Sequence, residues 1–369
     1  MGKKIKMGVI GLGGRGRSLI RTASENKDVE VTAVCDLNED CLELTKQMFE
    51  ERGLFNIKYF SSLEDLINSD VEAVIVAVPI ELHCDVSIEL LNAKKHVICE
   101  IPIFSNMDEA KRLCRAVTDN PEVSFMTAEN CCFWAFVHSW KKMYESDMLG
   151  RVVIAEAQYL HNTERPIHHS IREDKWRAFL PAITYITHSL GPLVFMTGDE
   201  CVSVCGFAPE YNPYKEEHPA DPNGIAIIRT KSGAIFKILI SFGAHSHCVH
   251  NFALHCVEGT LQTQFNLDNF DHEGCETIAQ LRKVPCIPGD DYLRIPLGLG
   301  FPKSKHKGGH GGADAETIGS FVDSLLKNEK PALGFKEGYN MSMPGILAQE
   351  SILNGSKEIK IPSIEELLK

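Results

Sequence analysis

A glycine-rich turn near the N-terminus constrains the fold of this chain more than any other feature. The run Gly11-Leu12-Gly13-Gly14-Arg15-Gly16 follows a short apolar stretch, residues 5–10, and leads into an amphipathic segment, residues 15–24. A second apolar stretch, residues 29–35, ends at Asp36, 20 residues after Gly16. Strand, GxGxxG turn, helix, second strand and acidic residue in this order are the fingerprint of a dinucleotide-binding Rossmann fold.

Each residue of the turn has a role that its type explains. Gly11 permits the tight turn, Gly13 lets the backbone approach a pyrophosphate, and Gly16 lets the helix pack closely on the strand. The helix that starts around Gly14 and Arg15 presents free N–H groups and a partial positive charge to phosphates. We therefore expect these five residues to contact the cofactor.

The acidic residue at the end of the second strand indicates which dinucleotide binds. Asp36 can accept hydrogen bonds from ribose hydroxyls and would repel a 2′-phosphate. Residues 37–40 are neutral or acidic, and Arg15 and Arg17 in the turn are the only nearby bases that could compensate. The sequence predicts that NAD binds in preference to NADP.

Apolar strands and amphipathic helices alternate up to residue 127, which predicts a doubly wound parallel sheet with helices on both faces. Further strands are expected at residues 57–60, 73–78, 96–100 and 123–127, and helices at 39–51, 63–67, 82–93 and 107–117. Ligands of such sheets bind at the carboxyl ends of the strands, here at Gly11, Asp36, Val78-Pro79, Glu100 and Glu129-Asn130. We expect residues 1–127 to form the NAD-binding domain.

The pattern changes after residue 150, where apolar and polar residues alternate in strand-like runs. Those runs lie at residues 152–159, 201–206, 225–229, 234–242 and 252–264. They predict an α/β domain, residues 128–369, with a large, mostly antiparallel open sheet. Helices are expected at residues 133–146 and 314–326, whereas residues 266–307, rich in Gly, Pro and charge, are expected to form loops.

Length, charge and cysteine usage argue against several classes of protein: membrane-spanning, nucleic-acid-binding and secreted disulfide-bonded ones. A chain of 369 residues is long enough for two domains, and no apolar run approaches the ~20 residues that cross a bilayer. The net charge is −12 and there is no basic stripe, so nucleic acid and anionic membranes are poor partners. The N-terminus lacks the features of a signal peptide, and thirteen cysteines without a CxxC pair indicate reduced thiols. We expect a cytoplasmic protein.

Histidines and aromatic residues gather in the second half. Tyr185 and His188, three residues apart, would share one face of a helix and could form a proton relay, although such a pair is usually a structural contact. His245 and His247 share one face of a strand and could hold a metal, but such histidines are more often surface or packing residues. Glu156 and His161 would point to opposite faces of a regular strand. No metal-ligand box is present, and no metal is predicted.

These residues resemble the glucose-fructose oxidoreductase, inositol dehydrogenase and rhizopine-catabolism oxidoreductase family (Gfo/Idh/MocA), over essentially the whole chain. The resemblance rests on the glycine turn, on Val78-Pro79 with His83, on Cys99-Glu100-Ile101-Pro102 and on the region of His188. It implies a Rossmann domain followed by an α/β domain whose sheet commonly forms an oligomer interface. His83, Glu100 and Asn130 would lie at the cofactor, and a homo-oligomer, a dimer or a tetramer, is expected.

Within the family, the chain is similar to branches that act on sugars and glycosides, including NAD-dependent α-N-acetylgalactosaminidases. The matching stretches are residues 128–133, Trp176-Arg177, residues 185–192, and residues 308–312 with Asp314. By this resemblance, Tyr185 and His188 are catalytic and contact the hydroxyls being oxidised. His161, Trp176 and Arg177 would hold the sugar.

Two positions depart from the family pattern. Most members have Glu-Lys-Pro where this chain has Glu100-Ile101-Pro102, and the lysine contacts the reacting hydroxyl. Many members also carry an Asp four residues before the His, where this chain has Thr184. Either Tyr185 and His188 carry the proton transfer, or another group or a metal replaces the lysine, or the hydride chemistry is lost.

The sequence therefore predicts an NAD-dependent oxidoreductase acting on a secondary hydroxyl of a sugar or glycoside, with carbon 3 of a hexose ring as the expected position. Three alternatives stay open. The first is a glycosidase that cleaves through transient oxidation of carbon 3. The second is a metal-assisted lyase or hydrolase that uses Glu156, His161 and His188. The third is an NAD-binding sensor without catalysis.

Overall fold

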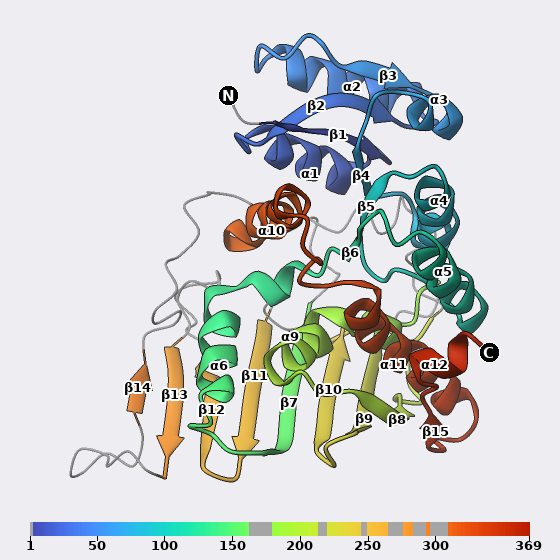
Figure 1. Ribbon diagram of the computed structural model, residues 1–369. Coiled ribbons are helices and arrows are strands. Elements are labelled where there is room, and N and C mark those ends of the chain that lie inside the picture. Colours follow the sequence, from blue (N-terminus) through green and yellow to red (C-terminus); the bar gives the residue numbers. More distant parts are fainter. Residues whose placement is uncertain are drawn as a thin grey trace. The chain divides into compact units, whose positions relative to one another are not determined.

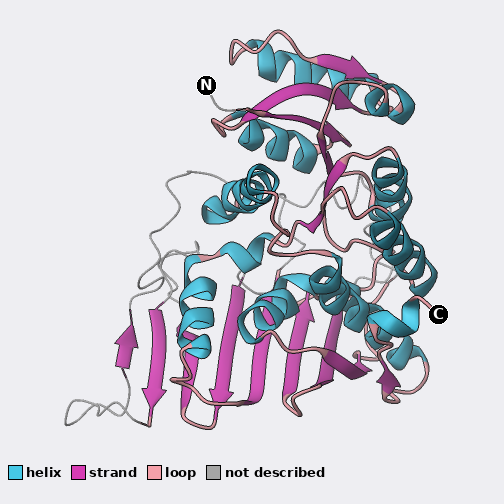
Figure 2. Ribbon diagram, in the orientation of Figure 1, coloured by secondary structure: helices cyan, strands magenta, loops and turns pink. Residues whose placement is uncertain are grey.

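The computed structural model describes residues 3–161, 179–212, 220–244, 249–264, 276–282, 293–295 and 309–369 (Figures 1 and 2). The chain divides into two units. The first contains residues 1–129, 312–339 and 364–369, and the second contains residues 130–311 and 340–363. No helix in the described part of the chain is long and apolar enough to cross a membrane. The expected division into an NAD-binding domain, residues 1–127, and a second domain, residues 128–369, stays a prediction.

The first unit contains a parallel sheet whose described strands have the order β3-β2-β1-β4-β5-β6. Its strands are β1 (Ile5–Ile10), β2 (Val29–Cys35), β3 (Lys58–Phe60), β4 (Ala73–Val76), β5 (His96–Cys99) and β6 (Phe125–Thr127). The order reverses between β1 and β4, which is the point at which such sheets bind ligands. The prediction of a doubly wound Rossmann sheet is therefore confirmed.

Helices connect these strands, and α1 and α2 lie on opposite faces of the sheet (Figure 1). They are α1 (Gly14–Ser24), α2 (Glu39–Glu50), α3 (Leu63–Ile67), α4 (Ile80–Asn92) and α5 (Met107–Asp119). The amphipathic pattern of α1 has the expected result, because Leu19, Ile20 and Ala23 are all buried. Asn38 and Asn106 cap α2 and α5 by accepting hydrogen bonds from backbone N–H groups of the first turn.

The end of the chain completes the first unit. Helix α10 (Ala313–Lys327) packs on α1, and helix α12 (Ile364–Leu367) packs on α5. After α10, the backbone N–H of Thr127 in β6 donates to the carbonyl oxygen of Leu333. Phe335 then packs against the rings of Phe104 and Phe125. The sequence contained no signal for this return of the chain.

In the second unit, the described strands form one sheet in the order β14-β13-β12-β11-β7-β10-β9-β8-β15. Its strands are β7 (Val152–Leu160), β8 (Cys201–Phe207), β9 (Asn223–Thr230), β10 (Ile235–Ser241), β11 (Val249–Cys256), β12 (Gly259–Gln264), β13 (Glu276–Leu281), β14 (Leu293–Ile295) and β15 (Ile359–Lys360). Only β7 and β10 pair in parallel among the described strands. The predicted large and mostly antiparallel sheet is confirmed.

Helices cover one face of this sheet (Figure 2). They include α6 (Ala135–Glu145), α9 (Thr187–Thr197) and the later part of α11 (Phe335–Leu353). Short 3₁₀ turns, η1 (Asn130–Phe133), η3 (Ala182–Tyr185) and η5 (His310–Gly312), precede α6, α9 and α10. Gly206 in β8 permits the close approach of α11, because a Cβ at this position would collide with the carbonyl group of Ala348.

Two expectations for this sheet were wrong. Residues 252–264 form two antiparallel strands, β11 and β12, because the chain turns at Val257 and Glu258. Residues 266–307 were expected to be loops, yet they contain β13 and β14. Both strands are specified by pairing with neighbours rather than by a continuous apolar pattern of their own.

Candidate functional site

The glycine turn between β1 and α1 has the backbone geometry that its sequence predicts. Gly11 has a φ of +89°, and a Cβ there would lie 2.5 Å from the carbonyl oxygen of Ala77. A Cβ on Gly16 would collide with the carbonyl oxygen of Gly11. In contrast, Cβ atoms built on Gly13 and Gly14 would meet no atom within 4 Å. The turn is closed on the side of the sheet and open where a ligand would approach.

The N-terminus of α1 fits a bound pyrophosphate. Its N-cap residue, Gly13, provides no side-chain hydrogen bond, and its first turn contains no acidic residue. The first turns of α2, α4 and α5 all contain acidic residues, which suits helix N-termini that face solvent. The bare N–H groups of α1 would hold phosphate oxygens of NAD.

Asp36 closes the same turn from the end of β2. Its Oδ2 accepts a hydrogen bond from the Leu12 N–H at 2.5 Å, and its Oδ1 accepts one from the Asn38 N–H at 2.8 Å. Arg17 donates to the Leu12 carbonyl oxygen at 2.5 Å and is thereby tied to the turn. The carboxylate still has lone pairs for ribose hydroxyls, since each oxygen accepts only one of these bonds.

Arg15 is held by two carboxylates of the first unit. Its guanidinium donates to Glu100 at 2.9 and 3.1 Å and to Asp314 at 2.6 and 2.9 Å. Burial opposes the charge of Arg15, but Glu100 and Asp314 outweigh it, and the net effect raises the pKa of Arg15. A phosphate contact from Arg15 would therefore come from its backbone N–H, since the side chain is already engaged.

His83 connects the loops that follow β4 and β5. Its Nε2 lies 2.8 Å from the carbonyl oxygen of Val78, and its Nδ1 lies 2.8 Å from that of Pro102. Burial lowers the pKa of His83 below its usual value, although both carbonyl groups and Glu100 act in the other direction. The ring thus fixes Val78 and the backbone beside Glu100, while Ile101 is buried.

In the second unit, Tyr185 and His188 lie together. Their ring centroids are 5.1 Å apart and the rings are edge to face. They do not share one α-helix as expected, because Tyr185 ends η3 and His188 lies in the first turn of α9. Ile186 between them keeps right-handed helical backbone angles, so the chain still brings both rings to one side.

The pair belongs to an aromatic cluster. Its members are Trp134, Tyr159, Tyr185, His188 and His250. Tyr159 in β7 and His250 in β11 are direct cross-strand neighbours, and their rings stack with centroids 4.1 Å apart. The Tyr159 ring also lies 5.7 Å from that of His188, and Trp134 lies 5.2 Å from His250. Sequence reasoning missed Tyr159, because its partners are distant in the chain.

Two more histidines adjoin the cluster. The ring of His161, predicted to contact substrate, lies 5.4 Å from that of Tyr159. His310 lies 6.5 Å from His188. Trp176, Arg177, His245 and His247 fall outside the described residues.

Glu156 is not part of this cluster. It alternates with Tyr159 and His161 along β7, and its carboxylate pairs with Lys237 at 2.9 Å. The ligands considered for the metal-assisted alternative, Glu156, His161 and His188, are therefore not brought together, since Glu156 lies on the other face of the sheet, as its spacing from His161 predicts.

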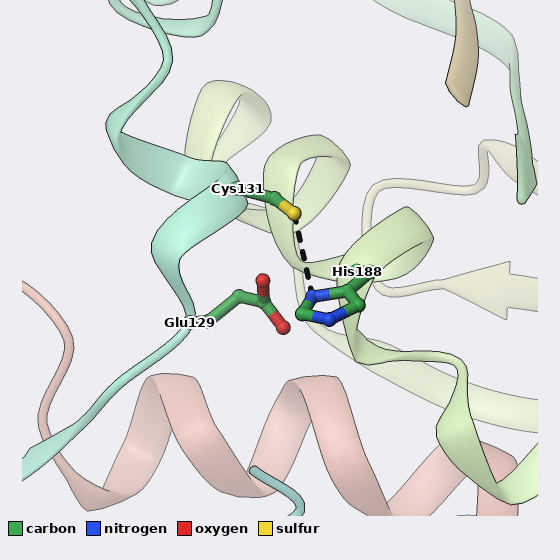
Figure 3. Close-up of side chains that lie close together, drawn as sticks. All are labelled: Glu129, Cys131 and His188. Carbon is green, nitrogen blue, oxygen red and sulfur yellow. Dashed lines mark hydrogen bonds between the residues drawn. The ribbon is translucent and has the colours of Figure 1, made fainter. Parts of the chain in front are cut away.

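A different group of three side chains converges at His188 (Figure 3). Glu129, Cys131 and His188 each offer one ligand atom, and these atoms lie within 4.8 Å of one another. The Cys131 Sγ lies 3.3 Å from the Nδ1 of His188. Glu129 and Cys131 come from one short segment, in which Asn130 starts the second unit and is itself buried. The sequence analysis placed Glu129 at the end of a strand but gave neither Glu129 nor Cys131 a role as a metal ligand.

A Rossmann sheet with an open glycine turn, joined to a second unit built on a large sheet, defines a two-domain nicotinamide-dependent oxidoreductase. Comparison with known families agrees. Residues 5–128 match the oxidoreductase family with an NAD-binding Rossmann fold named GFO/IDH/MocA, and residues 137–262 match the GFO/IDH/MocA C-terminal domain. The chain belongs to this family, which confirms the resemblance, the enzyme class and NAD as the cofactor.

Individual relatives are distant but match over nearly the full length. A glycosyl hydrolase family 109 protein of Solibacter usitatus is 24% identical, with 97% of this chain and 87% of the relative covered. An alpha-N-acetylgalactosaminidase of Shewanella oneidensis is also 24% identical, with 97% and 84% covered. A levoglucosan dehydrogenase solved with NADH and levoglucosan has a TM-score of 0.81 at 20% identity, with 98% and 100% covered. The last of these supports the fold.

Proposed function

We propose that this protein oxidises a secondary hydroxyl of a sugar or glycoside, with NAD as the hydride acceptor and carbon 3 of a hexose ring as the expected position. The observation that carries the proposal is the contact between Tyr185 and His188 inside a cluster of aromatic rings. Relatives named as glycosyl hydrolases and a neighbour that binds a sugar derivative support the substrate class.

The proposed reaction breaks one C–H bond and one O–H bond and forms a ketone. When bound, NAD⁺ accepts the hydride, that is, the proton and both electrons of the C–H bond. Tyr185 removes the hydroxyl proton while its own phenol proton passes to the imidazole of His188, which also orients the phenol. Both residues lie at the junction of η3 and α9, so the backbone holds them in a fixed relation.

Several residues would bind the two ligands. Sugars present apolar C–H faces and polar hydroxyls, which suit a site of aromatic rings with a few polar groups. Tyr159 and His161 offer such rings, and we propose that Trp176 and Arg177 also hold the sugar. At the cofactor, the proposed contacts are Gly11, Gly13, Gly14, Arg15, Gly16, Asp36, Val78, Pro79, His83, Glu100 and Asn130.

A second function is favoured by the full-length relatives, one of which is named as an alpha-N-acetylgalactosaminidase. Oxidation of carbon 3 acidifies the proton on carbon 2, so the aglycone can be eliminated. Water then adds, and the ketone is reduced again by the same cofactor. This cycle returns the hydride to the sugar and consumes no NAD.

One assay separates the two reactions. The enzyme is incubated with a panel of glycosides, once with a catalytic amount and once with an excess of NAD, and both NADH and free aglycone are followed. Stoichiometric NADH in the presence of excess NAD, without aglycone, would establish the dehydrogenase. Aglycone released without accumulating NADH would establish the glycosidase. Neither product across sugars and glycosides would refute the proposed oxidation.

We also propose a cytoplasmic homo-oligomer. The ten cysteines that the structure describes form no disulfide bond, as in proteins of a reducing compartment. The sheet face that carries Glu156 and Lys237 also carries Ile154, Ile227 and Leu239. Ile154 is 41% exposed, and such an apolar sheet face suits contact with a second copy of the chain.

A further inference from the structure

We propose that Glu129, Cys131 and His188 form a zinc site. The three residues offer a carboxylate oxygen, a thiol sulfur and an imidazole nitrogen within 4.8 Å of one another. Zn²⁺ accepts all three donor types, and three protein ligands with one open position are typical of its catalytic sites.

The distance between two of the donors fits a shared ion. A tetrahedral Zn²⁺ with Zn–S of about 2.3 Å and Zn–N of about 2.0 Å separates its sulfur and nitrogen by roughly 3.5 Å. The Sγ of Cys131 and the Nδ1 of His188 are 3.3 Å apart. A shift of a few tenths of an ångström would suffice for both atoms to coordinate one ion.

The backbone fixes the three donors. Cys131 lies in η1, which packs against α9, and His188 lies in the first turn of α9. Figure 3 shows the Glu129 carboxylate and the Cys131 sulfur directed toward the same imidazole. Glu129 and Cys131 are buried, whereas His188 is partly exposed. An ion held here would be shielded by protein on the side of the carboxylate and thiolate and accessible beside His188.

Such an ion could also assist the proposed oxidation. Zn²⁺ can polarise a substrate oxygen and lower the energy of developing negative charge. His188 lies against Tyr185, so the ion would be one residue away from the phenol that we propose takes the proton. This consequence rests on the proposed oxidation, whereas the binding of the metal does not.

The test measures metal binding in the absence of NAD and sugar. The full-length protein is stripped with chelator and titrated with Zn²⁺ against a chromophoric competitor, and a second sample is loaded with Co²⁺. We expect one Zn²⁺ per chain and a thiolate-to-cobalt charge-transfer band. Cys131→Ser should abolish the band and weaken Zn²⁺ binding by at least about 100-fold, the upper end of what loss of an outer-shell partner costs.

The neighbouring cysteine provides a matched control. Cys132 is also buried but does not belong to the group, so Cys132→Ser should retain both the band and the affinity. Glu129→Gln should weaken Zn²⁺ binding and keep the band, because the thiolate remains. NAD binding and thermal unfolding show whether each variant is folded.

Three results would overturn the site. They are no stoichiometric uptake of Zn²⁺ by the wild type, equal affinity in Cys131→Ser, and a ligand shell without sulfur in X-ray absorption of the zinc-loaded wild type. The absorption measurement needs no variant, so misfolding of a variant cannot obscure the answer. Failure of the site would leave the proposed oxidation intact, since NADH formation is measured separately.

Discussion

The carboxylate of Asp36 accepts a hydrogen bond from the backbone N–H of Leu12, with 2.5 Å between Oδ2 and N. The residue that selects the cofactor therefore also holds the glycine turn to the end of β2. We predict that the wild type binds NAD at least ~30-fold tighter than NADP, about 2 kcal/mol. Arg15 and Arg17 do not change this expectation, because Glu100, Asp314 and the turn backbone engage both side chains.

Two substitutions at this position separate charge from structure. Asp36→Asn keeps an oxygen that can accept the Leu12 N–H but removes the repulsion of a 2′-phosphate, so NADP should bind more tightly than in the wild type. Asp36→Ala loses both, and NAD binding should weaken further than in Asp36→Asn. Calorimetric titration of both cofactors measures these changes. Equal affinity for NAD and NADP in the wild type would show that the assignment is wrong.

Removal of Arg15 should destabilise the first unit. Its guanidinium neutralises Glu100 and Asp314, whose side chains are only 12% and 2% exposed. Arg15→Met leaves two buried carboxylates without this partner, which we expect to cost roughly 3–5 kcal/mol of unfolding free energy. Adding Asp314→Asn should restore part of the loss. Urea unfolding of the single and double variants checks this, and additive effects in the cycle would argue against the coupling.

Tyr185→Phe should separate binding from chemistry. The variant keeps the ring that contacts His188 and loses only the hydroxyl, so NAD binding and thermal stability should not change. Turnover should fall by at least ~10²-fold, as expected when the group that accepts the proton is lost. Steady-state rates with the best sugar or glycoside, together with a NAD titration, provide the measurement. Turnover at the wild-type rate would exclude Tyr185 from the reaction.

Because of its buried thiols, the protein should lose unfolding free energy as the pH rises above about 8.5. Burial raises the pKa of both Cys35 and Cys84 to about 12. An unfolded thiol ionises near pH 8.5, so above this value the unfolded state binds fewer protons and the unfolding free energy falls until the folded pKa is reached. Urea unfolding from about pH 8 to about pH 10 should show this decline, with a shallower slope in Cys35→Ala. An equal slope in wild type and variant would contradict it.

A charge on the open sheet face should disrupt the proposed oligomer. Leu239 in β10 pairs with Ile225 across the strand, and Leu239→Glu would place a carboxylate in that apolar region. Light scattering should then report a monomer, and thermal unfolding should report unchanged stability. Leu353→Glu is the matched control, because Leu353 is 75% exposed at the end of α11. A monomeric wild type would refute the proposed assembly.

The fold could be predicted from the sequence where the signals are local. The spacing from Gly11 to Asp36 specifies a strand, turn, helix and strand, and the buried face of α1 follows from its own periodicity. Strands β13 and β14 could not be recognised, because their pairing partners rather than their own residues specify them. The turn at Val257 and Glu258 is followed directly by Gly259, but this single glycine did not lead us to divide a run that looked continuous.

In the candidate site, too, contacts between residues close in the sequence could be predicted and contacts between distant residues could not. Tyr185 and His188 are three residues apart, so any right-handed turn brings them together, and their proximity could be predicted. Cys131 and His188 are 57 residues apart, and Tyr159 meets His250 only through the register of β7 and β11. Such contacts depend on the tertiary fold, and no spacing in the sequence encodes them. The roles of all these residues stay predictions.

The first unit is assembled from three separate stretches of chain, and this affects how the protein is made. Asp314, which holds Arg15, and Phe335, which packs on β6, are synthesised 187 and 208 residues after Thr127, where the sheet that they complete ends. A nascent chain that has reached only the end of β6 therefore exposes the surfaces that α10 and Phe335 later cover. We expect the first unit to reach its final stability only after α10 and Phe335 have been synthesised.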